Sequence, residues 1–371
     1  MENKQELPAG WKWVKLGEVC EIIKGKKPIL YDENTSNKAL PYLTAEVIRY
    51  NLKPKWCLES NGDVVRVNKD EIVIIADGSN SGEVFIGFEG ALASTMGKLK
   101  IINENVSTDF LYLFIKKNFK ELNAPKRGSA IPHLEKDIFY NLSIPLPPLS
   151  EQKRIAEKLK AMMDEIDEAK ASIEKQLEAA KALPSAYLSE VFESPEAQKW
   201  EKKKLGEVCK FMNGKFINKE NVHSQGTYPV YGANGIIGFT EEKMFEDKLI
   251  VIGRVGSCGM VNVTSGPSWI TDNTIILKPL NEIYFDFLYW KLKTLRLEEL
   301  RSSSVQPLIT QSSIKSLAIP LPPLSEQKRI ASYLKEKIDQ AEKLRETLEK
   351  ELETFNTLPQ SILSKAFKGE I

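Results

Sequence analysis

Apolar residues recur along two long stretches of the chain at alternating spacings of four and three, the seam pattern of a coiled-coil helix. The first stretch carries Ile155, Leu159, Met162, Ile166, Ala169, Ile173, Leu177 and Ala180. The second carries Ile330, Leu334, Ile338, Ala341, Leu344, Leu348, Leu352 and Phe355. Because each stripe would leave an isolated helix with an exposed apolar face, we expect the two helices to pack on each other. We expect the first helix to end near Leu183.

The two helices belong to a duplicated unit. Residues 144–156, IPLPPLSEQKRIA, return letter for letter at 319–331, and the related tails LPSAYLS and LPQSILS close the helices at 183–189 and 358–364. Two copies of one apolar face are buried most simply about a two-fold axis, which favours an antiparallel coiled coil. The duplication predicts a globular segment before each helix, with segment bounds of 1–149, 150–193, 194–324 and 325–371.

The globular segments combine strand and helix patterns. Runs of β-branched and apolar residues predict buried strands, and amphipathic runs after them predict helices. The expected strands are 70–76, 98–102, 247–252 and 273–277, and the expected helices are 110–119 and 284–300. The predicted fold class is therefore α+β, with two globular α+β domains joined by the long helices.

The two globular segments differ in length. The motif LGEVC near the start of each segment recurs after 189 residues, whereas the helix motif recurs after 175. The first segment therefore carries about 14 additional residues, which we expect to lie in surface loops.

The composition fits a globular protein with sizeable cores, since 42% of the 371 residues are hydrophobic and 28% are charged. No apolar run approaches the roughly 18 residues of a membrane span, and the polar first residues do not resemble a signal peptide. The four cysteines lie far apart, and with two histidines they show no zinc-binding spacing. We therefore expect a reduced, cytoplasmic protein, in which Cys20 and Cys209, at matching repeat positions, share a core role.

The formal net charge of +1 limits how the chain could bind nucleic acid. The first helical segment is net acidic and the second is close to neutral. Neither helix therefore has the positive charge that binding along the DNA phosphates requires. Contacts to nucleic acid would have to come from local patches in the globular segments, or from partners that bring more positive charge.

Motifs of catalysis are missing from the sequence. Gly97-Lys98 is followed by Leu99, where a phosphate-binding loop has Ser or Thr. The run from Gly78 to Gly82 places Asn80, not serine, at the centre of a would-be nucleophile elbow. The tetrapeptides Asn-Pro-Pro-Tyr and Asp-Pro-Pro-Tyr, which mark adenine methyltransferases, do not occur. We therefore expect no catalysis by this chain.

The order of segments and the repeated motifs resemble the DNA-specificity (S) subunit of Type I restriction–modification systems. Pro-Leu-Pro-Pro-Leu-Ser-Glu-Gln-Lys-Arg-Ile stands at each helix start, and Lys-Leu-Gly-Glu-Val stands at each globular segment start. The resemblance covers nearly the whole chain. It implies two target recognition domains that each read one half of a split DNA site, with the helices setting the length of the spacer between the halves.

The same resemblance implies a subunit without catalysis of its own. Its partners would be double-stranded DNA, two modification (methyltransferase) subunits and restriction (endonuclease/translocase) subunits. No cofactor is expected on this chain, while S-adenosylmethionine, ATP and magnesium are expected on the partner subunits. Two alternatives stay open: a specificity subunit that serves a fused restriction–methylation enzyme, and a tandem β-rich module, joined by a coiled coil, that binds protein or sugar.

Loops of the globular segments supply the candidate DNA contacts. Lysine suits backbone phosphates, arginine is the usual reader of guanine, and asparagine pairs with adenine. In the first segment the candidates are Lys24, Lys26, Lys27, Ser79, Asn80, Arg127, Ser129 and His133. In the second they are Asn213, Lys215, Asn218, Tyr231, Asn234, Arg254, Ser257, Arg301, Ser302 and Gln306. Simpler roles compete with these, since 24–28 could be a solvated loop and 231–235 a glycine-rich turn.

Overall fold

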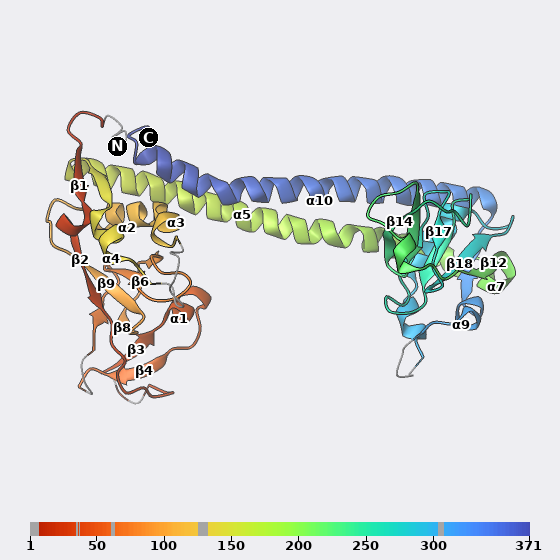
Figure 1. The fold of residues 1–371 in the computed structure, drawn as a ribbon, viewed down its shortest axis with the longest axis horizontal. Coiled ribbons are helices and arrows are strands. Elements are labelled where there is room, and N and C mark those ends of the chain that lie inside the picture. Colours follow the sequence, from red (N-terminus) through yellow and green to blue (C-terminus); the bar gives the residue numbers. More distant parts are fainter. Residues whose placement is uncertain (1–6, 35, 37, 61–63, 125–132, 303–307) are drawn as a thin grey trace. The chain divides into compact units, whose positions relative to one another are not determined.

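The computed structural model describes residues 7–34, 36, 38–60, 64–124, 133–302 and 308–371. The chain divides into two compact units, Met1–Ser172 with Glu351–Ile371 (unit 1) and Ile173–Lys350 (unit 2). The two long helices are α5 (Leu149–Phe192) and α10 (Leu324–Ala366). Each unit contains one globular segment and a portion of each long helix (Figure 1).

A four-stranded antiparallel sheet forms the centre of unit 1. Its strands are, in spatial order, β2 (Cys20–Lys24), β9 (Met96–Ile101), β6 (Ile72–Ile75) and β7 (Val84–Phe85). All four residues of β6 are buried. Ile72 and Ile74 pack in a core with helices, whereas Val73 and Ile75 pack in a second core. Successive side chains of a strand point to opposite faces, so this β-branched run is buried because both faces of the sheet are covered.

The rest of unit 1 covers this central sheet. A second sheet has the order β4 (Lys55–Leu58), β3 (Ala39–Leu43), β8 (Gly90–Leu92) and β5 (Arg66–Val67). Strand β1 (Lys12–Lys15) pairs with β10 (Ser143–Leu146), which leads into α5. The short helices are η1 (Leu16–Glu18), α1 (Ala45–Tyr50), α2 (Thr108–Lys117), α3 (Phe119–Leu122) and α4 (Lys136–Asn141). Figure 1 shows α2 between the sheet that contains β6 and β9 and the long helices.

Unit 2 repeats this plan. Its main sheet has the order β12 (Cys209–Asn213), β18 (Thr274–Pro279), β15 (Ile250–Gly253) and β16 (Val261–Val263). Its second sheet has the order β14 (Gly235–Thr240), β13 (Tyr228–Gly232) and β17 (Trp269–Ile270), and β11 (Lys202–Lys204) pairs with β19 (Ala318–Pro320). The short helices are α6 (Pro195–Lys199), α7 (Leu205–Val208), η2 (Lys219–Asn221), α8 (Phe285–Thr294), η3 (Leu297–Leu300) and α9 (Gln311–Lys315). The predicted mixture of helix and strand is confirmed in both units.

The globular segments differ in how two paired strands are connected. β3 and β4 are joined through α1, whose N-cap Thr44 accepts a hydrogen bond from the backbone N–H of Val47. β13 and β14 are joined instead by a tight turn at Ala233 and Asn234. Part of the additional length of the first segment therefore forms a short helix, where a surface loop was expected.

Both long helices continue through an internal proline. α5 extends past Pro184 to Phe192, so the predicted end near Leu183 is wrong, and α10 likewise passes through Pro359. A proline inside a helix costs about 3 kcal/mol because it removes a hydrogen bond and crowds the preceding turn. The residues beyond Pro184 offset this cost by packing on the core of unit 2; they are Tyr187, Leu188, Val191 and Phe192.

The apolar stripes of the long helices are buried or half-buried with one exception. Leu344 is 44% exposed, so its expected place in the second stripe is wrong. Counting four residues from buried Ala341 leads to Arg345, and three more lead to buried Leu348. Arg345 occupies that position with its charge paired to glutamates on its own helix, Glu342 and Glu349.

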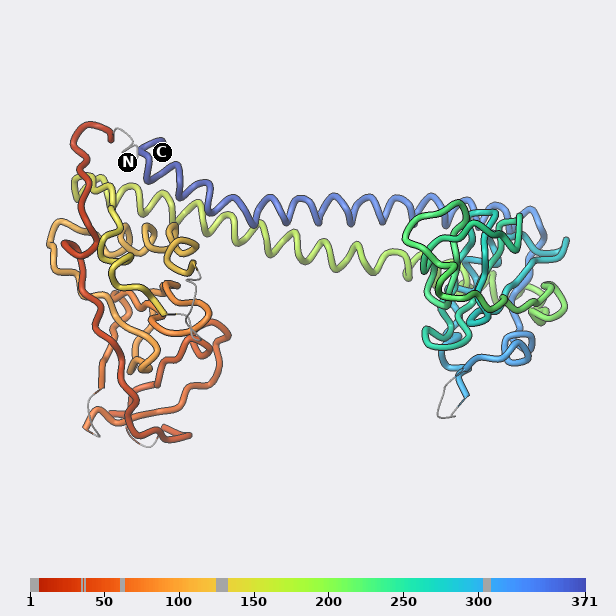
Figure 2. Tube along the Cα trace, viewed as in Figure 1, coloured from red at the N-terminus to blue at the C-terminus, as the bar shows by residue number. Residues whose placement is uncertain are grey.

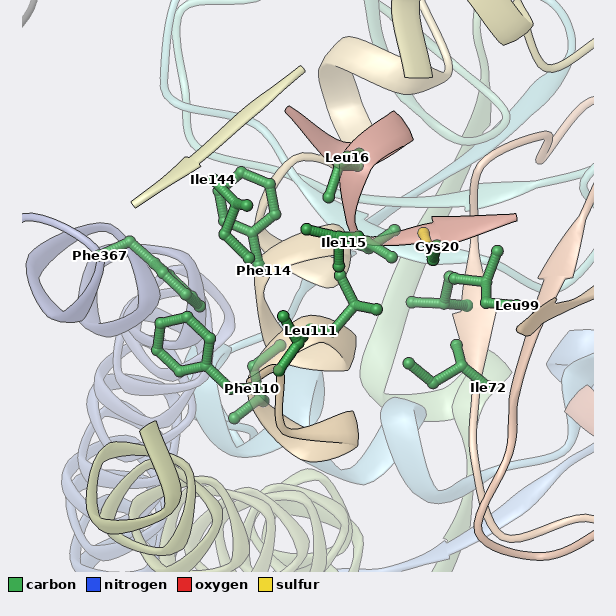
Figure 3. Packing of buried hydrophobic residues seen from close by; sticks show 14 of the residues in the cluster. Leu16, Cys20, Ile72, Leu99, Phe110, Leu111, Phe114, Ile115, Ile144 and Phe367 are labelled. Carbon is green, nitrogen blue, oxygen red and sulfur yellow. The ribbon is translucent and has the colours of Figure 1, made fainter. Parts of the chain in front are cut away.

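The end of α10 completes the core of unit 1. The ring centroid of Phe367 lies 4.9 Å from that of Phe110 and 5.2 Å from that of Phe114 (Figure 3). Ile155 and Leu159, at the start of α5, belong to the same cluster. Figure 2 shows the last turns of the chain beside the first turns of α5.

In unit 2 the two helices exchange these roles. Phe192, at the end of α5, packs with its ring centroid 5.5 Å from that of Phe287. Ile330 and Leu334, at the start of α10, share this cluster. Each globular segment is therefore completed by the start of the helix that follows it and by the end of the other long helix.

Truncating either phenylalanine is expected to destabilise one unit selectively. Phe→Ala in a core costs about 3–5 kcal/mol, so Phe367→Ala should speed hydrogen exchange in α2, and Phe192→Ala should speed it in α8. Hydrogen–deuterium exchange with mass spectrometry locates the effect. Phe216→Ala is the matched control, because Phe216 is 69% exposed. Equal protection of α2 in Phe367→Ala and the native chain would contradict the packing described above.

The cysteines are core residues. Cys20 and Cys209 open the corresponding strands β2 and β12 and are buried, which confirms their predicted shared role. All four cysteines, Cys57 and Cys258 included, are buried thiols outside any disulfide. Burial disfavours the thiolate and raises the pKa of Cys20 and of Cys209 to about 12.

We expect the native thiols to resist modification at pH 8 and all four to react after unfolding. Because the folded-state pKa of Cys20 and Cys209 is raised from 9.0, their protonated form stabilises the fold below about pH 9. This contribution is lost as the pH rises from there toward 12. Thiol labelling with and without denaturant tests the first expectation, and alkaline unfolding tests the second. Rapid labelling of Cys20 in the native chain would contradict both.

In the part of the chain that the structure describes, three or more His, Cys, Asp and Glu side chains do not gather into a group that could hold a metal ion. None of the described helices is long and apolar enough to cross a membrane.

Candidate nucleic-acid interface

In each unit a loop follows the first strand of the main sheet. The glycine at the start of this loop lies close against the backbone of a neighbouring segment, and we call this glycine the anchor of the loop. A Cβ on Gly25 would lie 2.3 Å from the carbonyl oxygen of Ala93, and one on Gly214 would lie 1.9 Å from that of Thr271. Only glycine fits such contacts. The next residue then donates its backbone N–H to the same neighbouring segment, from Lys26 to Leu92 at 3.1 Å and from Lys215 to Ile270 at 2.8 Å.

The side chains beyond the two anchors differ. In unit 1 the anchor is followed by Lys26 and Lys27, both exposed. In unit 2 it is followed by Lys215 and by Phe216, whose side chain is exposed. The same loop position therefore presents a cation in one unit and an aromatic ring in the other. Asn218 follows shortly after and stands at the N-terminal cap of η2.

Lys24 and His133 meet on one carboxylate of unit 1. Lys24 Nζ lies 2.7 Å from Asp77 Oδ2, and His133 Nδ1 lies 2.8 Å from Asp77 Oδ1. Burial tends to raise the pKa of Asp77, but the hydrogen bonds from Lys24 and His133 outweigh it and hold that pKa below its ordinary value. Two predicted contacts are thus brought together on a carboxylate that was not among the predicted contacts, and the charge of Lys24 is paired there.

The turn after β6 is organised by an arginine that the sequence analysis missed. Arg49, from α1, forms an ion pair with Glu83. With its amide oxygen turned toward Arg49, Asn80 accepts hydrogen bonds of 2.8 Å from both terminal guanidinium nitrogens. Ser79 is exposed at the tip of the turn. The side chain of Asn80 therefore helps to hold the turn through Arg49, and Ser79 is the more accessible of the two predicted DNA contacts.

In unit 2 several predicted contacts are engaged by neighbours. Asn213 Oδ1 accepts a 2.8 Å hydrogen bond from Gln311 Nε2, and Arg301 Nε donates to the backbone oxygen of Glu298 at 2.7 Å. The hydroxyl of Ser302 accepts a 3.4 Å hydrogen bond from the backbone N–H of Leu308. These bonds shape the loops from which the side chains project.

Exposure separates the remaining predicted contacts of unit 2. Asn234 and Ser257 are exposed in turns, and Arg254 is half-buried. Tyr231 is only 4% exposed, and its hydroxyl accepts a 3.0 Å hydrogen bond from the backbone N–H of Ser265. Its ring packs in a core, so the prediction that it contacts a base is wrong. Val230 and Gly232 on either side of it are buried too, so both faces of β13 are covered here.

Three predicted contacts, Arg127, Ser129 and Gln306, lie outside the described residues.

Two buried glutamines of the repeated motif connect the long helices to the globular segments, and their role was not predicted from the sequence. Gln152 Oε1 accepts from the backbone N–H of Ser107 at 2.9 Å, and its Nε2 donates to the backbone oxygens of Asn105 and Pro147, both at 2.8 Å. Ser107 is the N-cap of α2. The side chain thus fixes the first turn of α5 to the start of α2.

Gln327 makes the same three bonds in unit 2. Its Oε1 accepts from the N–H of Tyr284, the N-cap of α8, at 2.7 Å. Its Nε2 donates to the backbone oxygens of Glu282 at 3.1 Å and Pro322 at 2.8 Å. The sequence does contain a sign of this role, because a glutamine stands at the same position in both copies of the repeated motif.

Two solved structures share the fold of this chain. A chain of 24% identity with a TM-score of 0.76, covering 99% of this chain and 100% of its own, comes from a study titled "Structural basis underlying complex assembly and conformational transition of the type I R-M system". The crystal structure of the HsdS subunit from Thermoanaerobacter tengcongensis matches with a TM-score of 0.68 and 24% identity over 100% of both chains. At this identity the likeness establishes the fold alone.

Sequence comparison establishes the family. The Type I restriction enzyme MjaVIII specificity subunit of Methanocaldococcus jannaschii is 30% identical across 100% of this chain and 96% of its own length. The EcoDI specificity subunit of Escherichia coli is 24% identical across 99% of this chain and 90% of its own. The family model described as "Type I restriction modification DNA specificity domain" matches twice, at residues 8–179 and 197–354. This chain therefore belongs to the Type I restriction–modification DNA specificity family, as a specificity subunit with two such domains.

Proposed function

We propose that the chain binds a bipartite DNA target, with each globular segment acting as a target recognition domain for one half-site. The observation that carries this proposal is that both globular segments have a loop held by a glycine anchor at the same position, while the side chains that follow the anchor differ. A shared scaffold with Lys27 at one tip and Phe216 at the other suits two readers of unlike sequences. Phosphate contacts from the flanking lysines would position each reader, and base-edge contacts would specify the sequence.

We also propose that α5 and α10 pack as an antiparallel coiled coil that sets the spacer between the half-sites. The clustering inside each unit supports this arrangement. In unit 1 the start of α5 shares a core with the end of α10, and in unit 2 the end of α5 shares a core with the start of α10. A pseudo-two-fold pair of readers would meet half-sites on opposite strands, as two-fold dimers meet palindromes.

The proposed partners are two modification methyltransferase subunits and restriction subunits with endonuclease and translocase activity. This chain would supply recognition without catalysis or a cofactor of its own. S-adenosylmethionine, ATP and magnesium would be bound by the partner subunits. The DNA target and the four thiols outside any disulfide fit a cytoplasmic location.

Gel-shift titrations of the chain with and without a methyltransferase subunit test DNA recognition. We expect sequence-specific binding that weakens with salt and strengthens with the methyltransferase. Absence of specific binding in both forms would reject the proposal and favour a tandem module for protein or sugar ligands.

Mapping N6-methyladenine in the host genome tests the bipartite target. Methylation in two unlike half-sites at a constant spacing is expected. A continuous methylated motif would contradict the proposal that each recognition domain reads its own half-site. Purifying the complex distinguishes separate methyltransferase and restriction subunits from a fused restriction–methylation enzyme.

A further inference from the structure

A concave apolar surface borders the anchored loop of unit 2. A cavity of about 440 Å³ is lined by Phe216, Ile217, Lys219, Val222, Ile237, Thr271, Asp272 and Asn273. Phe216 is 69% exposed and Ile237 is 55% exposed. Phe216 and Ile237 thus place exposed apolar surface at one concave site, the kind of lining that ligand sites use.

The polar groups of this cavity suit the edge of a nucleobase. Asp272 and Asn273 are exposed at its border, where a carboxylate can accept from a base amino group and an amide can pair with adenine. Thr271 is only 4% exposed, and among the residues whose positions are described its Oγ1 has no hydrogen-bond partner. An unpaired buried hydroxyl is costly, so a shift of this segment that exposed Thr271 Oγ1 to an acceptor would recover a hydrogen bond.

The position of the cavity favours DNA over a protein ligand. Lys215 and Lys219 flank Phe216 along the loop and are of the type that contacts phosphates. The corresponding loop of unit 1, reached from the same kind of glycine anchor, carries Lys26 and Lys27. The family model match at 197–354 includes the whole cavity.

We propose that this cavity reads a thymine of the second half-site through its C5-methyl group, with Phe216, Ile217 and Ile237 as the apolar walls. Thymine is the DNA base that presents a methyl group in the major groove, and apolar side chains are its usual contact. The inference rests on the proposed DNA recognition and names the base feature that unit 2 selects. Unit 1, with Lys27 where unit 2 has Phe216, would lack this preference at the matching loop position.

Deoxyuridine scanning tests the proposal, because uracil differs from thymine only by that methyl group. The full complex with its methyltransferase subunits is titrated with target duplexes in which each thymine is replaced singly. At one position of the half-site read by unit 2, we expect affinity to fall about fourfold, the factor for burying one methyl-sized group. If no thymine of that half-site shows such a loss, the proposal is wrong.

Substitutions at the cavity wall assign the effect to this site. Phe216→Ala should bind the thymine duplex more weakly and bind the thymine and uracil duplexes equally, whereas Phe216→Leu should keep part of the difference. Ile29→Ala is the matched control, since Ile29 is 61% exposed in the corresponding loop of unit 1. That variant should keep the full methyl effect in the second half-site.

Two other results have distinct meanings. If the native complex binds no specific duplex, DNA recognition itself fails, and this inference fails with it. If the native complex binds specifically but Phe216→Ala keeps the methyl effect and instead weakens assembly with partner subunits, the cavity is a protein contact. In that case the thymine proposal is overturned while DNA recognition stands.

Discussion

Adding four residues to each long helix is expected to lengthen the spacer of the DNA target while leaving both half-sites unchanged. Four helical residues span about 6 Å at 1.5 Å per residue, against about 3.4 Å per base pair, so the spacer should grow by about one to two base pairs. The insertions belong after Ala169 in α5 and after Lys350 in α10, close to where both helices pass from one unit to the other. Mapping N6-methyladenine in cells that carry the variant measures the new spacing.

Inserting the same four residues into α5 alone is the control. In an antiparallel pair, one lengthened helix places its apolar stripe out of register with that of its partner. This variant should therefore lose stability and methylation instead of acquiring a new target. If the doubly extended variant methylates the original target, the helices do not set the spacer, and that part of the proposed function is wrong.

Long periodic patterns were the features that sequence could predict. The two stripes and the repeated motif indicated both helices, and the β-branched runs indicated β6 and β15, because burial on both faces of a sheet demands such residues. The predicted end of α5 was wrong because local sequence rules place the end of a helix near a proline such as Pro184. Packing by Phe192 on Phe287, which local rules do not include, extends the helix beyond it.

Single exposed or buried positions were harder to predict. Leu344 was assigned to the stripe because it is apolar, yet spacing from Ala341 gives that place to Arg345, whose charge is paired within its helix. Tyr231 was assigned to a DNA contact because it stands beside a glycine-rich turn, yet it packs in a core at the end of β13, where three consecutive residues are buried. Residue type alone is misleading in both cases: helical spacing decides the exposure of Leu344, and coverage of both faces of β13 decides the burial of Tyr231.

The candidate DNA contacts were predicted by type and loop, but their partners were not. Sequence placed Lys24 and His133 among them, whereas Asp77, which holds both, became visible only in the fold. Arg49 was missed for the same reason, since its partner Glu83 is 34 residues away. Such contacts depend on how strands pair, and pairing leaves little trace in the local sequence.

Gln152 and Gln327 were also missed, because a glutamine in the first turn of a helix is usually solvated. Both are fully or almost fully buried, at 0% and 1% exposure. Each bonds one backbone N–H and two backbone oxygens at the junction of helix and globular segment, and in each unit the bond to the proline oxygen is buried. A polar residue preserved in both copies of a duplicated motif is thus explained by a structural requirement that each unit has to meet.

Replacing Gln152 by leucine is expected to destabilise unit 1 by about 1–3 kcal/mol, the cost of one buried backbone group left unpaired, because its bond to the backbone oxygen of Pro147 is buried. Gln327→Leu should do the same to unit 2. Denaturant unfolding measures the loss, and hydrogen exchange should show faster opening of α2 in the first variant and of α8 in the second. Gln340→Leu is the matched control, since this exposed glutamine makes one 3.2 Å bond to Glu336 on its own helix. Its effect should stay within about 0.5 kcal/mol. Unchanged stability in Gln152→Leu would mean that the junction is held by the apolar contacts alone.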